Sequence, residues 1–174
     1  MNEYQFELTF KLPQGEDAEQ YFAALEKSCS DAMIGTGQAG YMAFDFTRES
    51  KSAYDAIVSA VENVKKAIPK ALLVEATPDF VGLTDVAELL GFTRQYMRKL
   101  MVKSGTTFPS PVHEGKPSIW HLSNILIWLK ENNKYEVEDA LIDVANVNKE
   151  FNLIKELSQV NDFNQNNIRE LIAS

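Results

Sequence analysis

The 174-residue chain has few of the residues that disulfide frameworks and metal clusters need: it has one cysteine and two histidines. The single cysteine, Cys29, excludes a disulfide within the chain, and with only His113 and His121 beside it a Cys/His zinc cluster is excluded as well. No apolar run approaches the roughly 20 residues that cross a bilayer, and the N-terminus lacks the basic start and apolar core of a signal peptide. We therefore expect a soluble, cytoplasmic protein without a metal or other cofactor.

Positive charge is also scarce, because 17 basic residues accompany 25 acidic ones and the net charge is −8. An acidic surface repels the phosphates of nucleic acid. The charge is unevenly distributed, however: residues 1–79 carry −6, residues 80–134 carry +3 and residues 135–174 carry −5. A basic segment between two acidic ones is a pattern that a nucleic-acid-binding segment can produce.

The first part of the chain has the pattern of an α+β domain. Residues 4–12 alternate apolar and polar side chains, which predicts a strand with one buried face. Helical spacing over residues 17–27 and 50–68 predicts two helices, the first of which should bury Tyr21, Phe22 and Leu25. Three shorter strands are expected within 28–37, 41–46 and 71–76. The order β-α-β-β-α-β predicts a ferredoxin-like domain over residues 1–78.

Residues 83–102 predict a helix-turn-helix. Thr84 is a suitable N-cap for a first short helix, Gly91 supplies the left-handed turn that ends it, and Phe92 fills the angle between the helices. Thr93 caps the second helix, over residues 94–103. The side chains expected to be buried share one face of each helix: Val86, Leu89 and Leu90 in the first, and Met97, Leu100 and Met101 in the second.

The second helix of such a unit enters the major groove with its N-terminus first. Thr93, Arg94 and Gln95 therefore fall where base edges lie, and arginine can pair with guanine and glutamine with adenine. The residues expected to contact the backbone follow along the same helix: Tyr96, Arg98, Lys99 and Lys103.

The next twenty or so residues predict a wing, which is a β-hairpin beside the second helix. Residues 112–113 form one strand, residues 118–121 return antiparallel, and Lys116 in the turn can reach a phosphate or the minor groove. A helix capped by Ser123 follows. Trp120 and Trp128 are expected in the core.

Residues 80–132 resemble the winged helix-turn-helix of phage excisionase-like regulators, relatives of the mercury-resistance-regulator superfamily. The resemblance rests on LTDVAELLGFTRQYMRKL, on FPSPV and on the IWHLSNILIWL segment. Many relatives have an arginine shortly after the tryptophan, where this chain has His121 and Leu122. The resemblance implies a prokaryotic or phage protein that binds double-stranded DNA through the second helix and the wing of a domain over residues 80–133, as a dimer or in arrays.

The C-terminal segment, residues 135–174, is expected to be helical. Apolar residues between 136 and 158 are spaced alternately by three and four, as in a coiled-coil seam. A long apolar stripe needs a surface to cover it, so we expect this segment to pair two protomers, as readers of two half-sites require. The alternative is an ordinary solubilising surface. A final short helix is expected over residues 165–172.

No catalytic constellation can be assembled, because the two histidines lack a neighbouring carboxylate pair and the GTGQAG stretch (35–40) lacks the ending of a phosphate-binding loop. We therefore expect a dimeric, sequence-specific transcriptional regulator, not an enzyme, with an N-terminal domain that binds an effector or a protein partner. Two alternatives remain open: an antitoxin or adaptor whose acidic domain binds a basic protein, and an excisionase-like architectural DNA binder. A helical hairpin that serves only packing is the structural alternative for residues 83–102.

Overall fold

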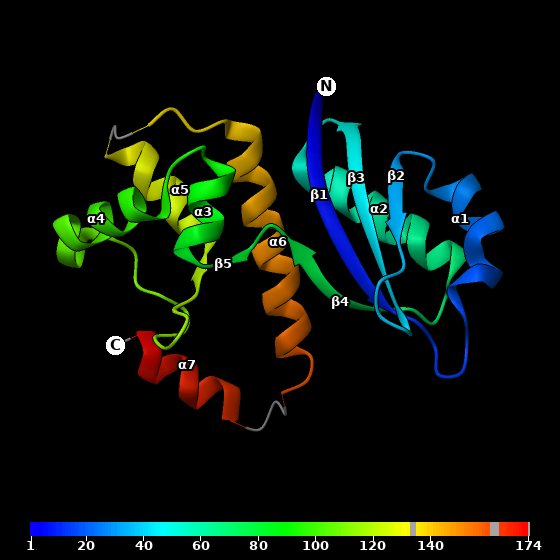
Figure 1. Ribbon diagram of the computed structural model, residues 1–174. Helices are drawn as coiled ribbons and strands as arrows, with labels where there is room; N and C mark the ends of the chain where they lie inside the picture. The colour runs from blue at the N-terminus through cyan, green and yellow to red at the C-terminus, as the bar shows by residue number, and fades with distance from the viewer. Residues whose placement is uncertain (133–134, 161–163, 174) are drawn as a thin grey trace.

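The computed structural model describes residues 1–132, 135–160 and 164–173. It is a mixed α+β structure, 51% helix and 22% strand, with an antiparallel four-stranded sheet. Figure 1 shows a sheet lobe and a helical lobe with the long helix α6 (Asp139–Leu157) between them. Within the described residues, no helix combines the length and the hydrophobicity needed to cross a bilayer.

The sheet lobe contains four strands in the spatial order β2-β3-β1-β4. Their bounds are β1 (Asn2–Lys11), β2 (Ala32–Gly35), β3 (Tyr41–Ser50) and β4 (Leu72–Thr77). Two helices connect them, α1 (Phe22–Ser28) and α2 (Ala53–Ala67). The predicted chain order β-α-β-β-α-β is confirmed for this part of the chain.

One face of the sheet carries the first hydrophobic core. Phe6, Leu8 and Phe10 point to this face from β1 and are at most 2% exposed, as the alternating pattern predicts. The rings of Phe6 and Phe46 stack across the paired strands with centroids 5.3 Å apart. Helices α2 and α6 pack against β1, so the sheet presents its apolar side to both.

The first predicted helix differs from expectation at Phe22, which is 42% exposed instead of buried. The segment begins as a 3₁₀ turn, Ala18–Tyr21, and becomes α-helical only at Phe22. A 3₁₀ turn has three residues per turn, so the inward positions fall at Ala18, Tyr21 and Leu25. Phe22 is thereby displaced to the outside.

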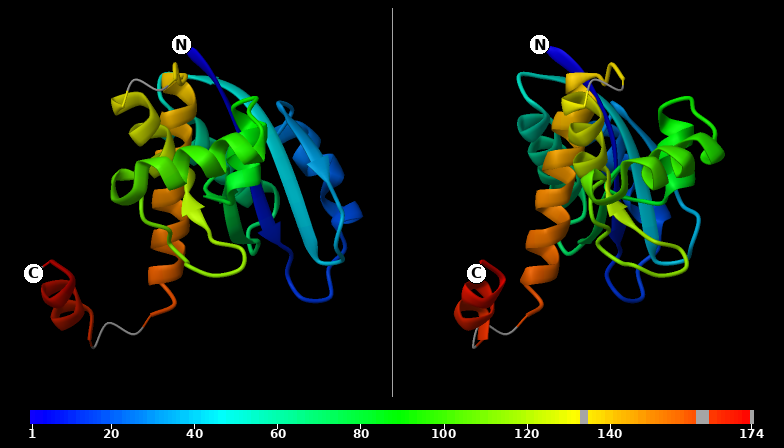
Figure 2. Two further views of the ribbon diagram at one scale, coloured as in Figure 1. Left: turned by 60° about the vertical axis from the view of Figure 1, so that its left-hand side comes forward. Right: turned by 90° about the vertical axis from the view of Figure 1, so that its left-hand side faces the viewer.

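The helical lobe is built from two short strands and three helices. Their bounds are β5 (Phe80–Val81), α3 (Leu83–Leu89), α4 (Arg94–Ser104), β6 (Trp120–His121) and α5 (Leu122–Glu131). β5 and β6 pair antiparallel, and a second hydrophobic core lies among the three helices. The remaining helix, α7 (Gln165–Ala173), agrees closely with the expected final helix, and in both views of Figure 2 it lies past the end of α6, apart from the sheet.

Two of the predicted helix caps are wrong. Helix α3 begins after Gly82, not at Thr84, because the Asp85 carboxylate accepts the Gly82 N–H at 2.6 Å and closes the first turn. Helix α5 has His121 as its N-cap, so Ser123 is a buried residue of the first turn. In both cases the short strand that precedes the helix, β5 or β6, leads directly into it, so the helix begins before the predicted cap residue.

Leu89 also differs from the prediction, since it is 45% exposed whereas Ala87 is buried. The inward face of α3 is covered by Val86 and Ala87, and Leu89 lines the cleft that α3 forms with β1 and α6. Leu90, just beyond the helix, packs partly against the second core, as predicted.

The apolar stripe of residues 136–158 is covered within the chain as far as Phe151, whereas Ile154 is 66% exposed. Helix α6 contacts β1, β4 and α2 on one side and α5 on another. Val144 belongs to the sheet-lobe core, whereas Ile142 and Ala145 belong to the helical-lobe core. The residues of the stripe up to Phe151 therefore need no second protomer to cover them, whereas the pairing of protomers through residues 136–158 stays a prediction.

A buried polar network joins the two lobes at the linker between β4 and β5. Asp79 is fully buried, and one carboxylate oxygen lies 2.7 Å from His121 Nδ1. The other oxygen accepts from Asn152 Nδ2 of α6 at 2.8 Å. Asn152 also bonds the N–H and the C=O of Ala76, at 2.9 and 2.8 Å. One side chain of α6 thus holds both the edge of the sheet and the start of the helical lobe.

Candidate nucleic-acid interface

The connection between α3 and α4 is a tight turn with the predicted geometry. Gly91 has φ of +70°, in the left-handed region that glycine adopts most readily. The Phe92 N–H donates to the Ala87 carbonyl at 2.7 Å, which closes the turn onto α3. Thr93 Oγ1 accepts the Tyr96 N–H at 3.1 Å, so Thr93 caps α4 as predicted. Although Thr93 is exposed, its hydroxyl oxygen is already engaged by the helix.

Helix α4 buries one face and exposes the others. Met97 and Leu100 are buried and Met101 packs partly against the second core, as predicted. The α4 residues predicted to contact DNA are all exposed: Arg94, Gln95, Tyr96, Arg98, Lys99 and Lys103. The helix contains no acidic residue, so its exposed surface carries only positive charge.

Tyr96 is exposed and also packed. The centroid of its ring lies 5.4 Å from that of Phe92 and 6.0 Å from that of Tyr135. The ring centroids of Phe92 and Tyr135 are 4.4 Å apart. Tyr135 comes from the segment before α6, so this aromatic cluster fixes the first turn of α4 against the C-terminal part of the chain. Sequence reasoning missed the cluster because Tyr135 lies far from Tyr96 along the chain.

Residues 112–119 form a hairpin beside α4, where the wing was predicted. The N–H groups of Val112 and His113 donate to the Ile119 carbonyl at 2.7 and 3.2 Å, and the Ile119 N–H donates to His113 at 2.9 Å. The predicted return strand is only partly correct, because residues 120 and 121 pair with β5. Lys116 is exposed in the turn of this hairpin.

Two grooves flank α4, one on each side. Arg94 and Arg98 line the first groove together with Lys116 of the hairpin, so these three cations face one space. Lys99 and Lys103 line the second groove, which lies between α4 and the C-terminal end of α5. Residues four apart share one side of a helix, which is why each pair lies in a different groove.

None of these five cations forms an ion pair or a hydrogen bond with another described residue. Arg48 in the sheet lobe is different, because its guanidinium bonds Asp31 at 2.6 Å and holds the pKa of that carboxyl below its ordinary value. The positive charge of α4 and the hairpin is therefore available to a partner, whereas that of Arg48 is used within the fold.

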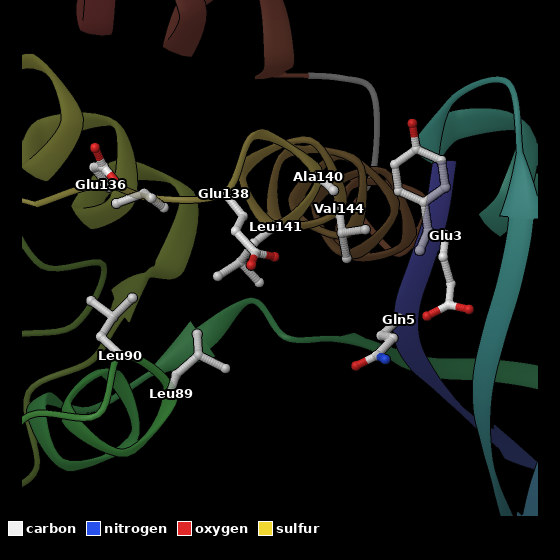
Figure 3. Close-up of a pocket in the computed structure, with 11 residues that line it drawn as sticks. Glu3, Gln5, Leu89, Leu90, Glu136, Glu138, Ala140, Leu141 and Val144 are labelled. Atoms are coloured by element: carbon white, nitrogen blue, oxygen red, sulfur yellow. The ribbon is translucent and has the colours of Figure 1, made fainter. Parts of the chain in front are cut away.

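A cleft of opposite charge lies between the two lobes, bounded by β1, α3 and α6 (Figure 3). Its apolar lining includes Leu89, Leu141 and Val144. Figure 3 shows Glu138 and Gln5 on different sides of the cleft, with Leu89 extending from α3 between the lobes. Three glutamates and no lysine, arginine or histidine line it, so it does not suit a phosphate.

Two other candidate chemistries find no support in the described residues. No group of three or more histidine, cysteine, aspartate or glutamate side chains is arranged to hold a metal ion there. Cys29 is 2% exposed, and burial raises the pKa of its thiol. A nucleophilic role would need an accessible thiolate, and both burial and the raised pKa oppose one.

Comparisons of the chain with protein-family models, with curated proteins and with solved structures gave no match. Function is therefore inferred from the geometry and charge of the surfaces described above.

Proposed function

We propose that the protein is a sequence-specific regulator of transcription that binds double-stranded DNA, with α4 in the major groove and the 112–119 hairpin beside it. The observation that carries this proposal is the set of five exposed, unpaired cations on α4 and the hairpin turn. They are gathered on one helix and its neighbour in a chain whose net charge is −8. Phosphate contacts by such cations supply most of the affinity of DNA-binding proteins.

The proposal includes two domain assignments. A sheet of order β2-β3-β1-β4 with helices in the two connections supports a ferredoxin-like domain for residues 1–78. Two short helices joined at Gly91, followed by a hairpin, support a winged helix-turn-helix for residues 80–133. Helix α6 belongs to neither alone, because it contributes to both cores.

Within this interface we assign roles by position. Arg94 and Gln95, in the first turn of α4, read base edges, because the first turn is the part of such a helix that enters the groove deepest. The residues that hold backbone phosphates are Arg98, Lys99, Lys103 and Lys116. Thr93 acts as a cap, since its hydroxyl oxygen already accepts the Tyr96 N–H.

The acidic cleft between the lobes is the place we propose for an effector or partner of the N-terminal domain. It is lined by β1 of one lobe and α3 of the other, so an occupant would contact both. A ligand that binds one relative orientation of the lobes better than another shifts their populations and thereby changes DNA affinity.

A second candidate function is supported by the exposed face of the sheet. Glu3 lies directly opposite Glu49, and Glu7 directly opposite Asp45, on the paired strands β1 and β3. Like charges directly opposite each other destabilise a sheet, and a basic partner would relieve this repulsion. The observation favours an antitoxin or adaptor that binds a basic protein, a role compatible with DNA binding in one chain.

The decisive experiment is a selection of duplexes from a random-sequence library with the full chain at two salt concentrations. A defined motif should emerge, and its affinity should fall with salt by about 0.9 log units per log unit for each phosphate contacted. Arg94→Ala should relax the sequence preference at one base pair and lower the binding free energy for the preferred duplex by about 1–3 kcal/mol.

Lys116→Gln should weaken the binding of all duplexes alike and make the affinity less dependent on salt concentration. Lys27→Gln, on the exposed surface of α1, changes the net charge equally and serves as the matched control. Failure to enrich any motif, or equal losses in Lys116→Gln and Lys27→Gln, would contradict the assignment.

A further inference from the structure

The two edge strands of the sheet differ in their hydrogen bonding. In the spatial order β2-β3-β1-β4, β4 is one edge and β2 is the other, and Figure 1 shows β2 on the side of the sheet away from α6. On the β4 edge, Asn152 of α6 bonds the N–H and the C=O of Ala76. Lys155 Nζ, also from α6, donates to the Val74 carbonyl. Side chains of α6 therefore occupy the β4 edge.

The outward backbone groups of β2 have no such partners. The Thr47 N–H of β3 donates to the Asp31 carbonyl at 3.3 Å, and hydrogen-bonded pairs alternate with non-bonded pairs along an antiparallel ladder. In the register of β2 and β3, Ala32 and Ile34 are therefore the residues whose backbone groups face outward. Within the described residues, nothing bonds the Ala32 carbonyl or the N–H and C=O of Ile34. Met33 between them is 73% exposed, so β2 presents an open edge to solvent.

Apart from its short length, the β2 edge has none of the features that commonly keep exposed strands from pairing. Such strands are protected by charged side chains, by proline or by a covering element. Residues 32–44 contain no charged residue and no proline, although 24% of the chain is charged. An open, unprotected edge can accept one more strand, a mode of recognition in which main-chain hydrogen bonds hold an extended peptide.

A pocket with an acidic lining opens where β2 ends. Thr36, the residue after β2, lines it together with Phe22 at the start of α1. Asp17 and Glu19 also line the pocket, and no lysine, arginine or histidine does. Phe22 is 42% exposed. An aromatic ring with carboxylates nearby suits the aliphatic stem and the cationic head of a lysine or arginine side chain.

We propose that β2 binds an extended, basic segment of a partner protein as an additional strand of the sheet. Asp45, directly opposite Met33 on β3, is exposed and attracts basic side chains of the segment. The pocket takes a further basic side chain past the end of β2. Asp17, Glu19 and Asp45 form no ion pair with another described residue, so their charge is available to a partner. This inference rests on the second candidate function, the binding of a basic protein, and is independent of DNA binding.

Hydrogen exchange of single amides in the full chain tests the proposal. The probe is a short synthetic peptide in which lysine alternates with valine, so that its lysines share one face of the bound strand. The Ile34 N–H should exchange about tenfold more slowly when about nine-tenths of the chain is bound, because only the free chain then exchanges. The Ala76 N–H donates to Asn152 with or without the peptide, so its exchange should not change.

Two control peptides separate strand pairing from charge attraction. A peptide with proline in place of valine keeps the charge but cannot pair as a strand, and it should leave the exchange of Ile34 unchanged. A peptide with glutamate in place of lysine keeps the strand pattern and should bind much more weakly. Equal protection of Ile34 by either control peptide would overturn the proposal.

A matched pair of variants tests the location. Met33→Lys adds a cation beside the open edge and should lower the affinity for the lysine peptide about three- to tenfold. Tyr54→Lys adds the same charge on α2, at a residue that is 57% exposed, and should change the affinity less than about twofold. Equal losses in the two variants would contradict binding at β2.

The outcomes distinguish this inference from the functions proposed above. If the lysine peptide binds and Ile34 exchanges as in the free chain, strand addition is overturned and the second candidate function stands. A lysine peptide that does not bind contradicts both. Protection of Ile34 in the free chain that disappears on dilution shows a second copy on β2 and overturns the inference. DNA binding is tested separately by the duplex selection.

Discussion

Asn152 of α6 allows a quantitative test of how the two lobes are joined. Its side chain is fully buried and makes three hydrogen bonds, two to the backbone of Ala76 and one to the Asp79 carboxylate. Asn152→Ala removes all three and leaves a strand N–H, a strand C=O and one carboxylate oxygen without a partner. We expect the junction to be weakened more than a cavity alone would weaken it.

The size of the loss follows from these bonds. Each of the two bonds to Ala76 contributes about 1 kcal/mol, and the bond to the charged Asp79 about 1.5–3 kcal/mol. Water that enters the space left by the amide recovers part of this, so we expect the free energy of unfolding to fall by about 3 kcal/mol.

Asn148 provides the matched control, one turn earlier on the same helix and also fully buried. It makes a single hydrogen bond, to the Pro78 carbonyl at 3.2 Å, and its own Oδ1 has no partner among the described residues. Asn148→Ala therefore removes one weak bond and one unsatisfied acceptor, and we expect a loss of no more than about 1 kcal/mol.

Urea unfolding followed by circular dichroism measures both losses. The reasoning requires that Asn152→Ala be the more destabilising variant by about 2 kcal/mol. Equal losses, or a larger loss in Asn148→Ala, would refute the idea that the buried amide of Asn152 holds the lobes together.

Three further substitutions test other parts of the fold. Glu49→Lys should raise the free energy of unfolding by about 0.5 kcal/mol, because it replaces a like-charge pair with Glu3 by an opposite-charge pair; no gain in urea unfolding would contradict this. Gly91→Ala should lower the free energy of unfolding by about 1 kcal/mol or more, because a residue with a Cβ is strained at φ of +70°. No atom lies within 4 Å of the added carbon, so the loss comes from the backbone conformation and not from a clash. Asp31 has a lowered pKa in the fold because Arg48 donates to it, so its stabilisation is present above about pH 4 and is lost as pH falls through the lowered pKa. Asp31→Asn should therefore flatten the acid limb of stability against pH.

The parts of the fold that were predicted correctly depend on near neighbours in the chain. The strand of β1 follows from strict alternation over Tyr4 to Leu12, and the cap of α4 follows from Thr93 and the backbone three residues on. The turn at Gly91 follows from one residue that tolerates a left-handed conformation. Each of these features needs only a window of about ten residues, which one strand or three helical turns span.

The parts that were missed depend on partners far away in the chain. β5 is two residues long, too short to show any periodicity, and it takes β6 as its partner. This pairing explains why the predicted wing strand ends at Ile119 and why Ser123 does not cap α5. Leu89 has the spacing of a buried residue but faces the cleft between the lobes.

The candidate interface shows the same division. The identity of its cations and their exposure on α4 were predictable, because the helical period places them opposite Met97 and Leu100. Their separation into two grooves was not, since it depends on where the hairpin and α5 lie beside α4.

Sequence alone thus determined the helices, the main strands, the turn and the charge of α4, because each depends on contacts within a few residues. Tertiary structure alone decided what covers each apolar surface. The spacing of α6 is the same whether its stripe faces a second protomer or the two lobes of its own chain, and as far as Phe151 it faces the lobes. Asn152 meets Ala76 across 76 positions, a distance over which periodicity carries no information about partners.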